Sequence, residues 1–175
     1  MTLNEIKNAI RNVPDFPKPG IQFKDITTAL KQPEIFHQML DLMAEKYRHT
    51  KIDYIVGIES RGFIFGTPLA YILGCGFIPI RKPGKLPAEI ISQEYALEYG
   101  TDKIEMHKDA LKRGDTVLII DDLIATAGTA EAAAKLITQA GAKIIGFTFA
   151  IELLSLQGRK TLEKYAPVFS LIQYE

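Results

Sequence analysis

The sequence has 175 residues, which suits one domain spanning residues 1–175 that buries its core without disulfides or a structural metal. Lysine and arginine number 21 and aspartate and glutamate number 21, so the net charge of zero does not favour nucleic acid or an anionic membrane as a partner. Cys75 is the only cysteine, which excludes an intrachain disulfide and fits a reducing compartment. The N-terminus lacks a signal-peptide pattern, and no apolar run approaches the ~20 residues of a spanning helix, so we expect a cytoplasmic protein.

The first quarter of the chain shows two helical patterns separated by prolines. Apolar residues share one helical face over residues 3–10, which predicts a short opening helix. Pro14, Pro17 and Pro19 then predict a rigid, irregular segment. Apolar residues return at helical spacing after Pro33 and predict a second helix ending near residue 47.

The rest of the chain alternates between short apolar runs and helical patterns. We expect strands at residues 54–58, 77–80, 117–120, 144–151 and 168–172, and helices at 63–73 and 130–139. Strands that are apolar on both faces and separated by helices predict an α/β fold with a mostly parallel sheet flanked by helices. In such sheets ligands bind at the carboxyl ends of the strands.

Residues 82–107 depart from this alternation. The segment is polar, holds several prolines and glycines, and alternates weakly in hydrophobicity around residues 90–97. A connection of this length in a small domain is typical of a binding loop or lid. We therefore expect residues 82–107 to form a lid or hairpin over a binding site.

The segment at residues 117–129 carries the strongest chemical signal. A buried strand ends in Asp121 and Asp122, passes through small and hydroxyl residues, and opens a helix. Small residues let backbone N–H groups approach an anion, and a helix start adds unpaired N–H groups and a positive dipole end. One carboxylate should face the ligand and the other the flank, because successive strand residues point apart. This predicts a phosphorylated sugar ligand; an ordinary turn with a solvated acidic pair is the alternative.

This segment resembles the phosphoribosyl pyrophosphate signature of the type I phosphoribosyltransferases. The resemblance implies that family's fold, with the 5′-phosphate held by Ala125, Thr126, Ala127, Gly128 and Thr129. It also implies that Asp121 and Asp122 serve the ribose hydroxyls. The family usually has glycine at the position of Ala127, and the added methyl restricts the loop.

Further stretches narrow the resemblance to the adenine phosphoribosyltransferases. They lie at residues 16–26, 59–63, 81–87 and 95–100, and with the phosphate loop they match in order across nearly the whole chain. The resemblance implies transfer of the phosphoribosyl group from phosphoribosyl pyrophosphate to adenine, giving AMP and pyrophosphate. It also implies that residues 1–30 form an N-terminal base-binding segment.

Basic residues near two strand ends are candidates for the leaving group. Arg61 lies in a turn before a helix, where a guanidinium can grip pyrophosphate; a surface arginine is the alternative. Lys82 and Lys85 flank a Pro-Gly turn, which on its own fits a solvated turn equally well. The resemblance makes both lysines pyrophosphate contacts and suggests a cis peptide at Ser60–Arg61.

The resemblance places the proton-transfer group in the expected lid. Glu98 is the candidate acid or base, because the purine must lose a ring proton as its nitrogen attacks the sugar. A merely structural role for Glu98 in the hairpin is the alternative. Tyr99 would pack over the leaving group.

The base would be read by a segment near the N-terminus. Phe23 offers an aromatic face for a purine, or else a core anchor for this segment. The backbone of Ile21, Gln22 and Lys24 would read the purine edge. The family commonly has arginine at the position of Lys24, and lysine lacks the bidentate fork.

The histidines and the single cysteine do not form a metal-binding pattern. His37, His49, His107 and Cys75 show no metal-ligand spacing, so we expect no metal site made by protein alone, and Mg²⁺ carried by the pyrophosphate of the donor. A homodimer is implied by resemblance. The alternatives are the same reaction on hypoxanthine, xanthine or orotate, and a non-catalytic regulator that senses phosphoribosyl pyrophosphate.

Overall fold

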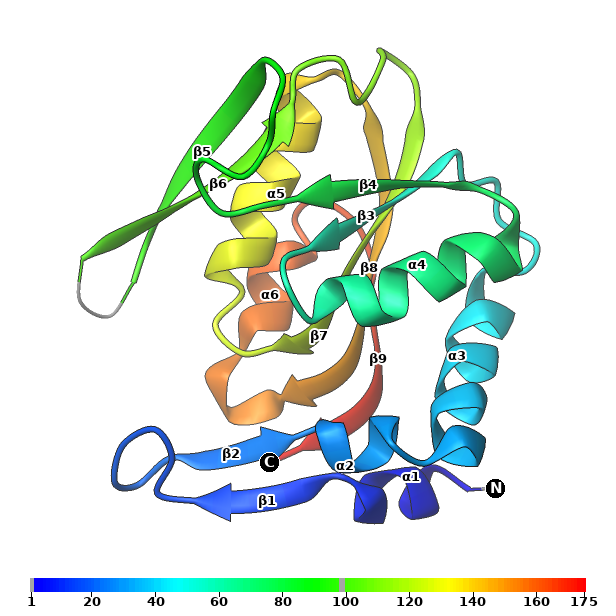
Figure 1. Ribbon diagram of the computed structural model, residues 1–175, viewed down its shortest axis with the longest axis vertical. Helices are drawn as coiled ribbons and strands as arrows, with labels where there is room; N and C mark the ends of the chain where they lie inside the picture. The colour runs from blue at the N-terminus through cyan, green and yellow to red at the C-terminus, as the bar shows by residue number, and fades with distance from the viewer. Residues whose placement is uncertain (1, 98–99) are drawn as a thin grey trace.

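A five-stranded parallel sheet forms the centre of the computed structural model, which describes residues 2–97 and 100–175 (Figure 1). Its strands lie in the order β4 (Gly76–Ile80), β3 (Tyr54–Ile58), β7 (Thr116–Ile124), β8 (Lys143–Leu153) and β9 (Val168–Tyr174). All four pairings are parallel. The expected mostly parallel α/β fold is confirmed, because apolar, β-branched runs form strands that can be buried on both faces.

Helices cover both faces of the sheet. One face carries α1 (Leu3–Ala9), α2 (Thr27–Leu30), α3 (Pro33–Tyr47) and α4 (Gly62–Leu73), whereas the other carries α5 (Gly128–Gln139) and α6 (Gly158–Leu162). A short 3₁₀ turn, η1 (Leu154–Leu156), precedes α6. Along β7, Leu118 and Ile120 pack with α3 and α4, whereas Val117 and Ile119 pack with α5. This alternation divides the core into two layers.

Two antiparallel hairpins accompany the main sheet and extend to the same side in Figure 1. The segment expected as a lid contains β5 (Ile90–Ala96) and β6 (Thr101–His107), paired from Ile90↔His107 to Ala96↔Thr101. The irregular segment predicted around the N-terminal prolines is the loop at residues 15–21, which joins two strands that the prediction missed, β1 (Arg11–Pro14) and β2 (Gln22–Asp25). The predicted irregular segment is thus confirmed for residues 15–21, and Pro14 is tolerated in β1 because both strands of a two-stranded sheet are edge strands.

Strand β7 is longer than its apolar run. The prediction ended it at Ile120, but its ladder with β8 continues through Leu123↔Ile151 and Ile124↔Glu152. Its pairing with β3 runs only as far as Gly57↔Ile120. The two acids therefore lie within the strand and project beyond the end of β3. The prediction missed this part of β7 because it relied on hydrophobic residues and the two acids are polar.

The strand order reverses between β3 and β7. The chain proceeds from β3 outward to β4 in one direction and from β7 to β8 and β9 in the other. Ligands of open α/β sheets bind in the crevice beyond the carboxyl ends of the strands at such a reversal. The topology therefore predicts a ligand site at the turns after β3 and β7. In the two described stretches, no helix has the length and apolar character needed to cross a membrane.

Candidate active site

The turn between β7 and α5 encloses a cavity of about 120 Å³. It is lined by Asp121, Leu123, Ile124, Ala125, Thr126, Ala127, Gly128, Thr129, Ala130 and Phe149. All five residues assigned to the phosphate from the sequence thus surround one small space at the start of α5. The helix start contributes backbone N–H groups and a positive dipole end. The cavity therefore has the size and polarity for a phosphate group.

Ala127 adopts a left-handed conformation at the entry to α5, with φ of 74° and ψ of 9°. This conformation costs an L-residue with a side chain roughly 1–2 kcal/mol, and glycine avoids most of that cost. The backbone carbonyl of Ala127 accepts a hydrogen bond from the N–H of Glu131 at 2.8 Å. The loop thus keeps the positive-φ turn that glycine favours, although this chain has alanine there.

The side chains of Asp121 and Asp122 point to opposite sides of β7. Asp121 lines the phosphate cavity, whereas Asp122 is buried and accepts a hydrogen bond from Nε of Arg61 at 2.5 Å. Burial first, and the charge of Asp122 second, raise the pKa of Asp121 well above its usual value. Asp121 is therefore the carboxylate beside the phosphate cavity, and Asp122 anchors the arginine.

The turn after β3 brings Arg61 to the acids of β7. Gly62, which opens α4, packs so closely that a Cβ atom there would lie 2.9 Å from the carbonyl oxygen of Ile120 and 3.1 Å from Oδ1 of Asp121. The expected cis peptide is in this turn, but it joins Glu59 and Ser60 rather than Ser60 and Arg61. This close approach of α4 to β7 fixes the position of Arg61.

Glu59 and Arg81 were not among the residues selected from the sequence. The nearly buried Glu59 carboxylate accepts hydrogen bonds from Lys85 Nζ at 2.6 Å, the Lys82 N–H at 2.9 Å and Arg81 Nη2 at 3.3 Å. Burial alone would raise the pKa of Glu59, but these donors lower it to about 2. The sequence did contain a signal for both residues, because each is a charged residue that directly follows a buried strand. Lys85 is thus beside Glu59, with about half of its side chain exposed.

Lys82 has different partners from Lys85. Its ammonium group contacts the carboxylate of Asp102 and the hydroxyl of Tyr95, which joins it to the β5–β6 hairpin. Burial acts to lower the pKa of Lys82, but the hydrogen bonds to Asp102 and Tyr95 outweigh it and raise the pKa. The same hairpin approaches the phosphate loop, since a Cβ atom at Gly128 would lie 3.6 Å from the Tyr95 ring.

Two candidate residues lie outside the described part of the chain. These are Glu98, predicted to transfer the proton, and Tyr99, predicted to pack over the leaving group. They connect β5 with β6, the hairpin that carries the partners of Lys82.

The N-terminal hairpin reaches the same crevice through Phe23. The guanidinium carbon of Arg61 lies 5.9 Å from the centroid of the Phe23 ring, which also makes an edge contact with Phe16. Lys24 points elsewhere: its ammonium group hydrogen-bonds Asn12 and lies 4.4 Å from the centre of the Tyr174 ring. Ile21 is exposed, and the side chain of Gln22 accepts a hydrogen bond from Asn12. Phe23 is thus the member of this segment that contacts the acid–arginine pair.

A profile of the phosphoribosyl transferase domain matches residues 26–175, which include the turn after β3, the hairpin and the phosphate loop. The chain belongs to the phosphoribosyltransferase family. Within this family it resembles the adenine phosphoribosyltransferase of Nostoc punctiforme, with 57% identity over 97% of this chain and 99% of the relative. It also resembles the adenine phosphoribosyltransferase of Chloroflexus aurantiacus, with 55% identity over 99% of this chain and 100% of the relative.

Solved phosphoribosyltransferases share the whole fold. The adenine phosphoribosyltransferase of Thermoanaerobacter pseudethanolicus superposes with a TM-score of 0.95 at 53% identity, covering 99% of this chain and 100% of its own. The enzyme of Saccharomyces cerevisiae, solved with an imino-altritol bisphosphate and adenine, has a TM-score of 0.91 at 44% identity, covering 97% and 98%. These matches extend over the N-terminal hairpin region that the family profile does not include, because each covers nearly the entire chain.

Proposed function

We propose that this protein transfers the phosphoribosyl group from phosphoribosyl pyrophosphate to adenine, releasing AMP and pyrophosphate, a purine-salvage reaction. The observation that carries the proposal is a continuous set of contacts across the crevice. The phosphate cavity borders Asp121, the adjacent Asp122 binds Arg61, and Arg61 lies against Phe23. Sites for a phosphate, a sugar, a leaving group and a base thus follow one another in the order of the reactants.

The relatives support the choice of base. Chains 55–58% identical over nearly their full length are adenine phosphoribosyltransferases. The structures from Saccharomyces cerevisiae and Giardia lamblia were solved with adenine and 9-deazaadenine, at 44% and 36% identity to this chain. Adenine is therefore the base we assign here.

The donor would be held at both of its charged ends. Backbone N–H groups of the loop from Ala125 to Thr129 receive the 5′-phosphate, and the Asp121 carboxylate accepts hydrogen bonds from ribose hydroxyls. Arg61, Lys82 and Lys85 bind the pyrophosphate. Both lysines are paired with carboxylates in this structure, so they would exchange these partners for the donor.

The reaction breaks one bond to C1 of ribose and forms another. The C1–oxygen bond lengthens, pyrophosphate leaves with the electron pair, and positive charge develops on the sugar, as in glycoside cleavage. Adenine N9 donates its electron pair to C1 from the opposite face, and Glu98 accepts or relays the proton that the purine loses. Arg61 and the two lysines stabilise the departing negative charge. The hairpin that carries Glu98 excludes water, which would otherwise hydrolyse the donor.

Mg²⁺ would enter on the pyrophosphate of the donor. Of the two acids on β7, Asp121 is the one that lines the phosphate cavity, so its side chain would supply the carboxylate oxygen that this ion prefers. Across residues 2–97 and 100–175, no group of three or more His, Cys, Asp or Glu side chains could hold a metal. The donor would therefore supply most of the ligands of Mg²⁺, and Asp121 would supplement them. When bound, the ion neutralises charge on the leaving group.

We further propose a cytoplasmic homodimer. Helix α4 exposes Ile64, Tyr71 and Ile72 at helical spacing, and Tyr71 is 88% exposed. An apolar stripe on a helix that carries Arg61 at its start suits a self-complementary interface between two copies. Sedimentation of the wild type and of Tyr71→Glu tests this assignment: the wild type should be dimeric and the variant shifted towards monomer.

Steady-state assays with adenine, hypoxanthine and guanine, with and without Mg²⁺, test the proposed activity. Adenine presents an amino donor beside an acceptor nitrogen, and hypoxanthine reverses both positions. A site that reads these groups through the backbone of residues 21–24 can discriminate by about 10⁴–10⁵ in kcat/KM. Comparable values for the three bases would leave the donor site in place and refute the adenine assignment. Donor binding without turnover of any base would favour the sensing regulator.

A further inference from the structure

The back of the phosphate loop rests against the start of α6. The N–H of Gly158 donates a hydrogen bond to the carbonyl of Ala125 at 3.1 Å. A Cβ atom at Gly158 would lie 2.3 Å from that carbonyl oxygen and 3.0 Å from the backbone nitrogen of Ala127. Both neighbours are backbone atoms, so no side-chain rotation could relieve the overlap. The phosphate loop and the start of α6 therefore fit together only when residue 158 is glycine.

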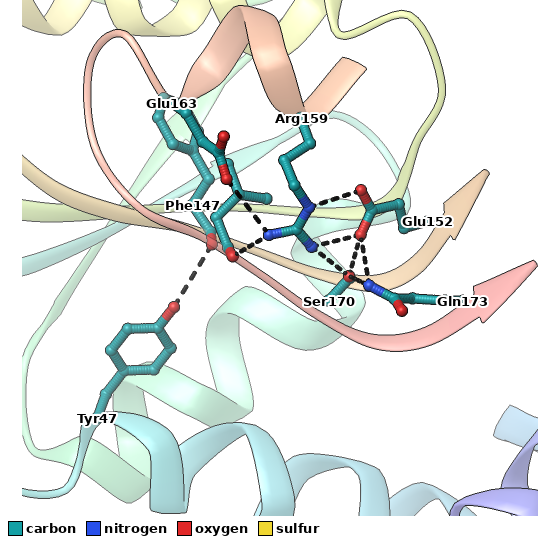
Figure 2. A network of polar contacts seen from close by, with 8 residues as sticks. Tyr47, Phe147, Glu152, Arg159, Glu163, Ser170 and Gln173 are labelled. Atoms are coloured by element: carbon teal, nitrogen blue, oxygen red, sulfur yellow. Dashed lines mark hydrogen bonds and ion pairs between the residues drawn. The ribbon is translucent and has the colours of Figure 1, made fainter. Parts of the chain in front are cut away.

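Arg159, the next residue, fixes α6 to the sheet. Its Nε and Nη2 atoms donate to the two carboxylate oxygens of Glu152 at 2.9 and 2.5 Å (Figure 2). Its Nη1 atom donates to the Val168 carbonyl at 2.6 Å. Ser170 and Gln173, both on β9, also donate to Glu152. The guanidinium thus connects α6 to both β8 and β9. Such a bidentate pair fixes orientation as well as distance.

The carboxylate in this network is itself aligned with the phosphate loop. Glu152 is 3% exposed and lies opposite Ile124, the residue immediately before Ala125, in the β7–β8 ladder. Burial would raise the pKa of Glu152, but hydrogen bonds from Arg159, Ser170 and Gln173 lower it, so the group is held as a carboxylate. Glu152 is thus connected to the phosphate loop in two ways. It pairs with Ile124, which directly precedes the loop, and its ion pair with Arg159 fixes α6, which contacts the loop.

We infer that Gly158 and Arg159 are positioning residues for the 5′-phosphate. Neither lies in the wall of the phosphate cavity. They act through the backbone of residues 125–127, whose N–H groups must converge on one small anion. Gly158 sets how close α6 comes to that backbone, and Arg159 sets the orientation of α6. Together the two residues therefore determine the shape of the phosphate cavity. This inference rests on the proposed function, in which the cavity holds the 5′-phosphate of the donor.

The variant Gly158→Ala tests the inference, and Gly76→Ala is the control for the same substitution at a crowded glycine far from the phosphate loop. A Cβ atom at Gly76 would lie 2.6 Å from the Tyr54 ring, so the same substitution creates an overlap with a side chain at the start of β4, at the opposite end of the sheet. The dissociation constant of ribose 5-phosphate is measured by calorimetry in both full-length variants. Gly158→Ala should raise it at least about tenfold, because N–H groups that no longer converge leave the bound phosphate without one or more charge-assisted hydrogen bonds of about 1.5–3 kcal/mol each.

The kinetic pattern separates positioning from general destabilisation. In Gly158→Ala the KM for phosphoribosyl pyrophosphate should rise while the KM for adenine stays at the wild-type value. Gly76→Ala should leave both unchanged even where it lowers the melting temperature. An unchanged dissociation constant in Gly158→Ala, or an equal loss of affinity in the control, would overturn the inference.

A second variant covers the case in which Gly158→Ala does not fold. Arg159→Lys keeps the charge but cannot bond Glu152, Ser170 and the Val168 carbonyl together. It should raise the dissociation constant of ribose 5-phosphate by a smaller factor, and a wild-type value there would also overturn the inference. A wild-type protein that binds ribose 5-phosphate but does not turn over adenine contradicts only the proposed function, because the binding measurement needs no base.

Discussion

Replacing Ala127 with aspartate places a carboxylate in the wall of the phosphate cavity. Ala127 is 7% exposed and lines a space of only about 120 Å³, so the new group cannot turn far from a bound phosphate. Aspartate and asparagine are several-fold enriched among the non-glycine residues with positive φ. Both residues can therefore adopt the φ of 74° that the loop requires at this position. The variant Ala127→Asp should fold normally and fail to bind the donor.

The size of the loss follows from the charges. Two unit charges about 4 Å apart repel by about 4 kcal/mol at an effective dielectric constant of ~20, the value suited to partly solvated sites. Each 1.4 kcal/mol is about tenfold in affinity, so the dissociation constant of ribose 5-phosphate should rise by about 10³. The melting temperature should change little, because the new carboxylate would lie in the phosphate cavity rather than among apolar side chains, where an unpaired charge is costly.

Ala127→Asn is the matched control, since it has nearly the same shape without the charge. Calorimetric titration with ribose 5-phosphate should show a much larger loss in the aspartate variant than in the asparagine variant, and high salt should narrow the difference. Equal losses in the two variants would mean that size rather than charge matters. Unchanged binding in Ala127→Asp would show that the phosphate does not bind in this loop.

Three further outcomes are expected. Gly62→Ala places a methyl group against the Ile120 carbonyl and should lower kcat/KM far more than Gly66→Ala does. Gly66 is the control because it lies in the same helix and its added Cβ would meet only side chains. Equal kcat/KM values in the two variants would refute a role for the contact between α4 and β7. Glu98→Gln should lower kcat by about 10²–10⁴ with donor affinity retained, as pre-steady-state kinetics can check. The pKa of Glu59 is lowered from 4.5 to about 2, so it adds stability above pH 4.5 that is lost as the pH falls towards 2. Urea unfolding should therefore show a weaker acid dependence in Glu59→Gln than in the wild type.

Local patterns predicted the elements that depend on residues close together in the chain. The apolar run at Tyr54–Ile58 gave the strand β3 with its observed ends, and helix α3 begins at Pro33, the residue after which the second helix was predicted. Burial periodicity and the fixed φ of proline act over a few residues, so they can be read without a partner segment. The same holds for the phosphate loop, whose small residues, acids and helix start are contiguous.

Patterns that depend on a partner strand were missed. Residues 11–14 and 22–25 form a hairpin although prolines separate them, because pairing between the two segments offsets the poor local propensity. Strand β7 continues through Asp121 and Asp122 because β8 supplies a ladder on one side. Alternation alone predicted that the two acids point apart, but only the packing of α4 decided that Asp122 meets Arg61 and Asp121 faces the cavity.

The sequence by itself determined an α/β fold, a phosphate-binding turn and the membership in a family through motifs of contiguous residues. The tertiary structure decided which distant groups meet: Glu59 with Lys85, Arg61 with Phe23, and Gly158 with Ala125. The physical reason is one of range. Backbone preference and burial period are properties of neighbours along the chain, whereas an ion pair or a backbone contact between residues 33 positions apart exists only after the sheet has brought their segments together.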